Sequence, residues 1–244
     1  MFKKTLPVSE IFGPTLQGEG PDIGRACIFL RLYVCHVQCP GCYTLYAWGH
    51  QVPKMAMTPT NIQKRLANLR GQKFKLGLVL SGGEPLMYYQ EPLLRDLLTD
   101  LGDWHWTGLE TSGCVGHDAD HLVLSWFIQL FSSVVLSPKI TPSLHGQGDD
   151  QKLDCLIPIF QEALGPDRLA FKFVVRNQAD IDAVLRSNDR HQFLNTYRTY
   201  LMPFGNNRDE ILKSIETLIP HAAHWGFIIT PRLHSLIWGA KRGV

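Results

Sequence analysis

The sequence has no long hydrophobic run. No apolar stretch reaches the roughly 20 residues that a membrane-spanning helix needs, and the start, Met1-Phe2-Lys3-Lys4, lacks the apolar segment of a signal peptide. We therefore expect a cytoplasmic protein that does not interact with membranes.

A strong net charge and low-complexity segments are absent as well. The 24 Lys and Arg residues nearly balance the 22 Asp and Glu residues, and no dense basic stripe marks a nucleic-acid surface. There is no internal repeat. With 244 residues and 45% hydrophobic residues, the chain is typical of one globular domain spanning residues 1–244.

A second close pair of cysteines is also missing. The six cysteines include one C-x2-C pair but no second one, so a zinc site built from two such pairs is disfavoured. His36 or His50 could still supply a fourth zinc ligand, and this alternative stays open. A disulfide framework is not expected, because a chain of this length can bury a core without cross-links.

What the sequence does contain is a compact cysteine motif. Cys35, Cys39 and Cys42 follow the apolar stretch Ala26–Val34 at the spacing C-x3-C-x2-C. Three thiolates on one loop, residues 35–44, can converge on an iron–sulfur cluster. Three ligands for four irons leave one iron open to another molecule, which favours catalysis over electron storage.

Around this loop, apolar strands alternate with helices. Such alternation predicts βαβ units and an α/β fold with a parallel sheet. The segment 10–20 is expected to be a flexible, glycine-containing loop. The expected strands are Ala26–Val34, Leu76–Leu80, Trp104–Glu110, Val134–Leu136, Leu169–Val175, Thr199–Met202 and Trp225–Thr230, and the expected helices are Pro59–Arg70, Glu91–Thr99, Gln178–Arg186 and Arg208–Leu218.

Polar motifs follow most of these strands. The C-terminal strand ends of such sheets carry the active site, so we expect the motifs to gather there. They are the cysteine loop, Ser81-Gly82-Gly83-Glu84, Glu110-Thr111-Ser112, Ser137-Pro138-Lys139 and His234. Arg31 lies within an apolar strand, where it faces either an anion or a structural ion pair.

Together these motifs resemble those of 7-carboxy-7-deazaguanine synthases, which are radical S-adenosylmethionine (SAM) enzymes. The resemblance covers nearly the whole chain, and its most specific marks are Leu16-Gln-Gly-Glu-Gly20 and Trp238-Gly-Ala-Lys-Arg-Gly-Val244. It implies a partial (βα) barrel of the radical SAM type, usually dimeric, with a [4Fe-4S] cluster, SAM, Mg²⁺ and a flavodoxin-type or other low-potential reductant. The implied reaction converts a pterin substrate, 6-carboxy-5,6,7,8-tetrahydropterin, to 7-carboxy-7-deazaguanine with loss of ammonia.

The resemblance also implies a role for individual residues. The cluster ligands would be Cys35, Cys39 and Cys42, and Thr44 would bind magnesium. SAM would contact Tyr43, Gly82, Gly83, Glu84, Ser137, Pro138 and Lys139. The substrate would contact Leu16, Gln17, Gly18, Arg31, Ser81, Glu110, His234 and Val244.

The chain departs from the family beside the third cysteine. The family has Trp-Cys-Asp-Thr, whereas this chain has Gly41-Cys42-Tyr43-Thr44. An aromatic partner for adenine and a carboxylate near the magnesium site are therefore missing, although Tyr43 could replace the former. The Cys39–Tyr43 segment also resembles activases of glycyl-radical enzymes. An activase acting on a protein, a related enzyme with an altered substrate, and a non-catalytic binding protein are the alternatives.

Overall fold

The architecture is one curved, mainly parallel sheet. The computed structural model describes residues 4–49, 55–71, 75–100, 104–115, 119–145, 156–239 and 241–243. Within these ranges, nine strands hydrogen-bond in the order β3-β1-β2-β4-β5-β6-β7-β8-β9, parallel from β2 to β9 and antiparallel on both sides of β1. They are β1 (Leu6–Leu16), β2 (Ala26–Leu32), β3 (Met55–Met57), β4 (Gly77–Gly82), β5 (Trp106–Thr111), β6 (Ser133–Leu136), β7 (Leu169–Val175), β8 (Arg198–Pro203) and β9 (Ile228–Ile229).

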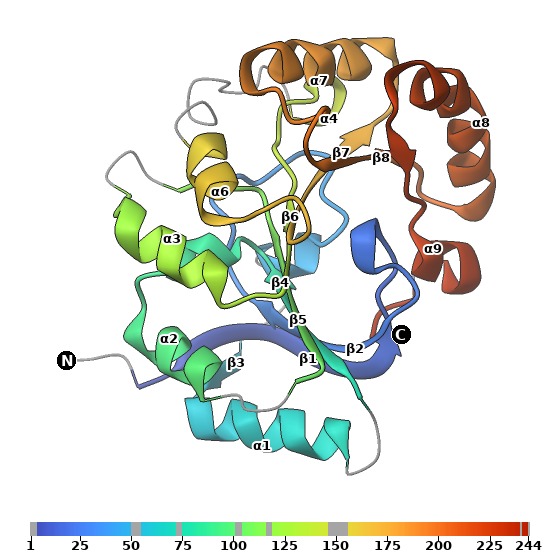
Figure 1. Cartoon of the computed structure of the whole chain (residues 1–244). Helices are drawn as coiled ribbons and strands as arrows, with labels where there is room; N and C mark the ends of the chain where they lie inside the picture. The colour runs from blue at the N-terminus through green and yellow to red at the C-terminus, as the bar shows by residue number, and fades with distance from the viewer. Residues whose placement is uncertain are drawn as a thin grey trace.

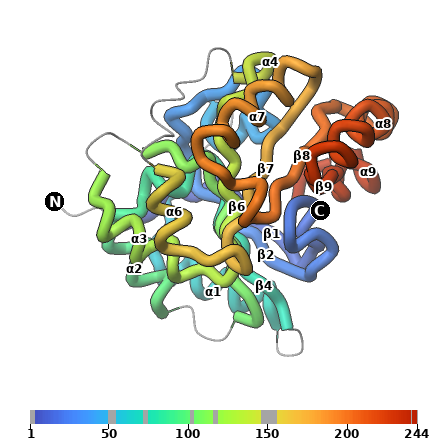
Figure 2. Tube along the Cα trace, turned by 45° about the horizontal axis from the view of Figure 1, so that its top comes forward, coloured from blue at the N-terminus to red at the C-terminus, as the bar shows by residue number. Residues whose placement is uncertain are grey.

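Helices lie in an arc around the outside of this sheet (Figures 1 and 2). This is the arrangement of a partial βα barrel, as predicted. The helices are α1 (Pro59–Arg70), α2 (Pro92–Thr99), α3 (His121–Gln129), α4 (Pro142–His145), α6 (Ile157–Ala163), α7 (Gln178–His191), α8 (Arg208–Trp225) and α9 (Leu233–Trp238), with short 3₁₀ turns at Gly20–Asp22, Leu45–Ala47 and Pro85–Tyr88. No helix in these described ranges is long and apolar enough to cross a membrane.

Successive side chains along each strand point alternately to the main core, beneath the helices, and to the inner face of the sheet. In β2, Leu30 and Leu32 join the main core beneath the helices, whereas Phe29 belongs to a smaller cluster on the opposite face. Lys172 alternates in the same way with Phe171 and Phe173, which are core residues of β7. Because side chains alternate with period two, single polar residues within apolar strands are directed to the inner face.

Local sequence signals explain the helix that was predicted best. Pro59 occupies the first turn of α1, and the Thr58 side chain accepts a hydrogen bond from the Asn61 amide. Gly71 ends the helix with φ of 61°, a conformation that glycine adopts without strain. The predicted limits of α1 and β7 match the structure.

The structure differs from the expectations in three respects. Residues 10–16 of the expected loop 10–20 belong to strand β1, so the sheet is mixed. The register of β1 against β2 shifts between Phe12 and Thr15, which lets the strand continue past Gly13-Pro14. Helix α8 continues beyond Leu218, through Pro220, and Trp225 is its last residue rather than the start of a strand. Helices α3, α4, α6 and α9 and strand β3 were not predicted.

Candidate active site

A cavity of about 530 Å³ opens at the C-terminal ends of the parallel strands. Each motif expected at this edge contributes residues to the lining of the cavity. The expected site residues that line the cavity are Leu16, Gln17, Gly18, Arg31, Cys35, Cys39, Cys42, Tyr43, Thr44, Ser81, Gly82, Gly83, Glu84, Glu110, Ser137, Lys139 and His234. The expected convergence is confirmed. Pro138 does not line the cavity, and Val244 lies outside the described residues.

The three motif cysteines face this cavity from one loop. The Cys42 sulfur accepts hydrogen bonds from the Trp48 indole (3.2 Å) and the Thr44 amide (3.4 Å), which suits a thiolate. Burial raises the pKa of Cys39 to about 11 and also raises the pKa of Cys35, so metal binding must displace protons from both thiols. The shared cavity and these donors fit an iron–sulfur cluster.

A single-ion site is not supported by the same geometry. In the described part of the chain, no three His, Cys, Asp or Glu side chains are grouped so that they could hold one metal ion. His36 is not among the residues lining the cavity, and His50 lies outside the described ranges. The zinc alternative therefore has no support among the residues that can be placed.

Two glycines let strand β4 clamp the start of the cysteine loop. The Gly83 amide donates to Leu32 O (3.0 Å) and the Glu84 amide to Val34 O (2.9 Å). A Cβ at Gly83 would overlap the Val34 carbonyl, and Gly82 has φ of 124° with the Leu32 backbone against it. Glycine is required at both positions by close backbone approach.

The Glu84 carboxylate is buried and fully engaged with its own chain. It accepts hydrogen bonds from the Leu86 amide (3.0 Å), the Ser112 amide (2.8 Å) and the Thr111 and Ser112 hydroxyls. These contacts join the ends of β4 and β5. A contact between Glu84 and SAM stays a prediction, and Glu84 has a structural role in addition.

Lys139 lies on the same side of the cavity as Cys39. Its ammonium group donates to the Ser137 carbonyl (2.8 Å) and hydroxyl (3.0 Å). The lysine charge is close enough to act on the Cys39 thiol and lowers its pKa, against the larger effect of burial. Positive charge next to the cluster loop suits an anionic group of a bound cofactor.

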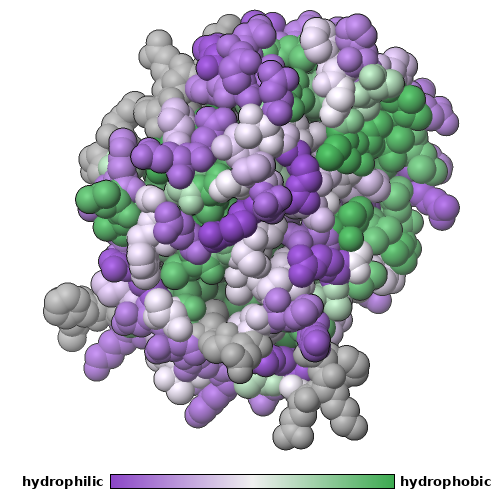
Figure 3. Space-filling view, viewed as in Figure 1, coloured by the Kyte–Doolittle hydropathy of each residue, from purple (hydrophilic) through white to green (hydrophobic). Residues whose placement is uncertain are grey.

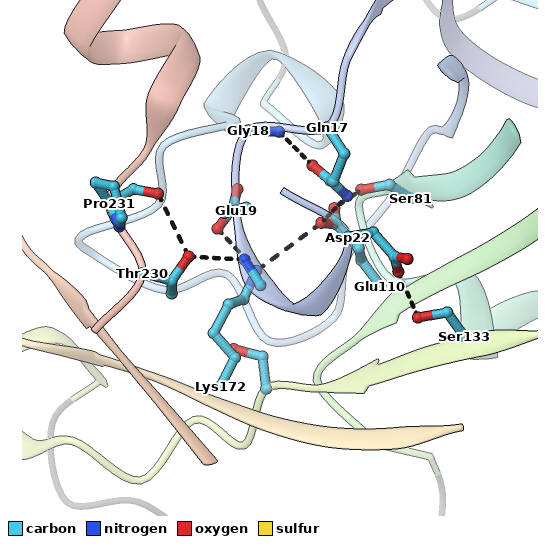
Figure 4. Close-up of polar contacts among 12 residues, drawn as sticks. Gln17, Gly18, Glu19, Asp22, Ser81, Glu110, Ser133, Lys172, Thr230 and Pro231 are labelled. Carbon is cyan, nitrogen blue, oxygen red and sulfur yellow. Dashed lines mark hydrogen bonds and ion pairs between the residues drawn. The ribbon is translucent and has the colours of Figure 1, made fainter. Parts of the chain in front are cut away.

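A network of polar side chains forms the opposite wall (Figure 4). Gln17 donates to Glu110 Oε1 (3.0 Å), and the Ser81 hydroxyl donates to Glu110 Oε2 (2.8 Å). Lys172 reaches up from β7 to Glu19 Oε2 at 2.8 Å and lies 3.9 Å from Glu110 Oε1. These contacts fix the orientation of Glu110 before any ligand binds.

Charge in this wall is set by the pairing of Glu19 with Lys172. Burial by itself raises the pKa of Glu19, but the Lys172 charge, together with His234 and Arg232, outweighs burial and lowers the pKa to about 2. Burial lowers the pKa of Lys172, and Glu19 and Glu110 reverse this effect so that the pKa is raised. The ion pair therefore remains charged across the physiological range.

His234 closes the network from the C-terminal side. The Leu233 amide donates to Gly18 O (2.7 Å), and a side chain at Gly18 would collide with the His234 ring. Burial lowers the pKa of His234, which makes a neutral imidazole at pH 7. Such a ring can donate or accept a hydrogen bond with a polar ligand.

Arg31 forms the structural ion pair that was one of its two expected roles, and binding of an anion stays a prediction. Its Nε lies 3.0 Å from Glu10 Oε1, and its guanidinium is held over the rings of Phe12 and Phe29 at 5.4 and 5.1 Å from their centroids. It also lines the cavity. The arginine is thus ion-paired and still placed to meet an anion.

The residues that differ from the family pattern are tightly packed. The Tyr43 ring stacks on Phe204 with centroids 5.3 Å apart, and its hydroxyl accepts from the Gly205 amide (3.2 Å). A Cβ at Gly41 would lie 3.0 Å from Leu144 and 3.7 Å from Phe204. Leu144 and Phe204 thus occupy the space in which an aromatic side chain at position 41 would lie.

Many cavity residues were not among the expected site residues. The acidic, lysine and arginine residues among them are Glu19, Lys172, Arg232, Lys241 and Arg242. Lys172 carried a signal in the sequence, a lone charge within an apolar strand. Lys241 and Arg242 belong to the C-terminal mark of the resemblance, but no site role was expected for them, because only the fold brings that segment against β1.

Comparisons with known proteins agree with this geometry. Residues 16–120 match the family described as "4Fe-4S single cluster domain". The chain is 30% identical to the 7-carboxy-7-deazaguanine synthase of Bacillus subtilis, over 99% of both chains, and 29% identical to that of Bacillus cereus, over 98% of this chain and 99% of the relative. The crystal structure of QueE from Escherichia coli superposes with a TM-score of 0.62 at 21% identity, covering 94% of this chain and 95% of that one.

Proposed function

The chain belongs to the 7-carboxy-7-deazaguanine synthase family, and we propose that it converts 6-carboxy-5,6,7,8-tetrahydropterin to 7-carboxy-7-deazaguanine with loss of ammonia. The observation that carries this proposal is the cavity itself. Three cysteines, a glycine-lined loop and a preoriented polar wall surround one space at the strand ends. A cluster, SAM and a small polar heterocycle can thus meet there.

The cluster and SAM would occupy the side formed by the cysteine loop. Cys35, Cys39 and Cys42 would hold the cluster, and Gly82 and Lys139 would contact SAM. When bound, the two cofactors would supply the radical chemistry that removes the hydrogen at carbon 6 of the substrate. The chain's own contribution is to position the reactants, since Gly82 and Gly83 bring backbone groups close to the cluster loop.

The substrate would contact the opposite wall. The heterocycle carries ring and amino N–H groups, which pair with carboxylate and amide oxygens. Glu110 is held by Gln17 and Ser81 at 3.0 and 2.8 Å, so its oxygens keep a fixed direction. Neutral His234 offers a second polar group, and Arg31 supplies charge for the substrate carboxylate.

Three further features are part of the proposal. We propose a cytoplasmic location and a low-potential reductant of the flavodoxin type, because the cluster must be reduced before SAM is cleaved. We also propose a homodimer. It is supported by exposed apolar side chains on α8, β9 and α9, where hydrophobic atoms gather on the surface in Figure 3: Leu212, Ile219, Trp225, Ile228, Ile237 and Trp238.

Anaerobic reconstitution tests the proposal. The protein is loaded with iron and sulfide, supplied with SAM, reductant and 6-carboxytetrahydropterin, and the products are followed by mass spectrometry. We expect 7-carboxy-7-deazaguanine and ammonia, and no product from the matched Cys39→Ala variant. Release of 5′-deoxyadenosine without 7-carboxy-7-deazaguanine would refute the substrate and leave the radical chemistry in place. Absence of both, from protein that carries a full cluster, would refute the enzyme class.

A further inference from the structure

The family resemblance implies that Thr44 binds Mg²⁺, yet two tyrosines close to Thr44 in the chain each lie under a guanidinium. Arg232 is 3.5 Å from the centroid of the Tyr43 ring, and Arg242 is 3.7 Å from that of Tyr46. The loop that carries Thr44 therefore has two positive charges packed on its side chains, which disfavours a divalent cation on this loop.

The oxygen donors that magnesium requires are missing from this place. Mg²⁺ is bound in proteins through one or two carboxylates, but Tyr43 replaces the family's aspartate. The Thr44 hydroxyl is 3.5 Å from the Cys42 sulfur. Glu10 approaches Tyr46, but it is already paired with Arg31 (3.0 Å) and Arg242 (3.6 Å). Among the described residues no group of three acidic, histidine or cysteine side chains could hold an ion. The site does not fit magnesium.

The same surroundings fit an anion. Arg232 is buried, with 6% of its surface exposed, and it lines the cavity. One terminal nitrogen donates to Gly205 O, while Nε has no hydrogen-bond partner in the part of the chain that the structure describes. The nearby carboxylate of Glu19 is already paired with Lys172 at 2.8 Å. A buried cation with an unmatched N–H is costly unless an acceptor arrives.

We propose that this enzyme binds the substrate carboxylate directly through Arg232, which shares it with Arg31, and that catalysis does not require Mg²⁺. Tyr43 holds the guanidinium by stacking, and the Tyr43 ring in turn stacks on Phe204, which itself carries Arg176 at 4.0 Å. The arginine therefore supplies at this place the positive charge that the family's metal would supply. This inference rests on the proposed function, since it assumes a carboxylated substrate.

The test measures binding and turnover separately. The reconstituted, SAM-loaded enzyme is freed of divalent cations by a chelating resin, and the Kd for 6-carboxytetrahydropterin is measured with and without Mg²⁺. We expect values within about twofold of each other, and turnover equally unaffected. Mn²⁺, used as a paramagnetic probe of the magnesium site, should show no bound fraction by electron paramagnetic resonance. Mg²⁺ stimulation of turnover, or a bound Mn²⁺ that Mg²⁺ displaces, would overturn the inference.

Variants identify the group responsible. Arg232→Met should weaken substrate binding at least about tenfold while leaving SAM binding within about twofold, since it removes a charge-assisted hydrogen bond. Arg232→Lys should recover part of the affinity. The control is Arg186→Met, because Arg186 is exposed on α7, and it should bind substrate like the unmodified enzyme. Equal losses of SAM and substrate binding in Arg232→Met, in a protein with an unchanged unfolding transition, would contradict the assignment.

A second substitution reverses the family difference. Tyr43→Asp removes the stacking partner of Arg232 and adds a carboxylate beside Thr44, so Mn²⁺ should now bind and substrate affinity should rise with Mg²⁺. Tyr43→Phe keeps the stack and should remain independent of Mg²⁺. No effect of Mg²⁺ on Tyr43→Asp would contradict the view that residue 43 decides between the two modes. If the unmodified enzyme does not bind 6-carboxytetrahydropterin under any condition, the proposed function fails, which is distinct from binding that requires Mg²⁺.

Discussion

The buried pair of Glu19 and Lys172 offers the sharpest test of the cavity's electrostatics. Lys172 is 6% exposed and Glu19 is mostly buried, with their charged atoms 2.8 Å apart. Lys172→Met keeps the length of the side chain and removes the charge. Glu19 is then left as a buried carboxylate beside Glu110, with its main counterion gone.

Two estimates of the cost agree. Breaking a buried ion pair by removing one partner typically costs about 3–5 kcal/mol. Independently, the pKa of Glu19 is lowered from 4.5 to about 2, and a difference of roughly 2.5 pKa units corresponds to about 3 kcal/mol of stabilisation of the charged form. We therefore expect Lys172→Met to lower the free energy of unfolding by about 3 kcal/mol or more.

The assay is urea unfolding at pH 7, followed by circular dichroism under anaerobic conditions, in a double-mutant cycle. Glu19→Gln combined with Lys172→Met removes both charges, so the double variant should be more stable than Lys172→Met alone, by about 2 kcal/mol. The reasoning fails if Lys172→Met lowers the free energy of unfolding by less than about 1 kcal/mol. It also fails if the losses of the two single variants simply add in the double variant, because Glu19 and Lys172 are then not coupled.

Three other outcomes follow from the site. Cys39→Ala should abolish cluster assembly, measured by iron content and visible absorbance. The control is Cys114→Ala, which changes a cysteine outside the cavity lining and should retain the cluster. Turnover by Cys39→Ala would contradict the ligand assignment. Arg31→Ala should weaken substrate binding by about tenfold or more and SAM binding far less, so equal losses would disprove its role. Because the pKa of Glu19 is lowered to about 2, its contribution to stability is present above pH 4.5 and is lost as the pH falls toward 2. The free energy of unfolding should accordingly fall less steeply with acid in Glu19→Gln, and identical slopes would refute this.

Much of the fold was predictable because local signals and burial agree. The apolar run Leu169–Val175 is a strand in any context that buries both faces, and Thr58, Pro59 and Gly71 set the ends of α1 by local hydrogen bonding and backbone freedom. Where local signals compete with packing, the prediction failed. Strand β1 pairs along β2 despite Gly13-Pro14, and α8 continues past Pro220, because cross-strand and helix–sheet contacts outweigh the cost of one break.

Part of the candidate site was predictable from the spacing of residues along the chain. Three cysteines within eight residues are typical of a cluster loop, and polar motifs after successive strands are expected to meet at one edge of a parallel sheet. Neither prediction depends on a distance in the folded protein. Val244 lies outside the described residues, and its contact with the substrate stays a prediction.

The expected kind of site follows from the amino-acid sequence, since ligand type, spacing and strand order depend on covalent connectivity. The pairing of the charges, in contrast, could be known only from the folded structure. Lys172 meets Glu19 across 153 positions of chain, and Arg232 stacks on Tyr43 across most of the protein. Electrostatic energy depends on separation and burial, which sequence distance does not report. The effect of having Tyr43 in place of the family's aspartate therefore depends on Arg232, which contacts Tyr43 only in the folded protein.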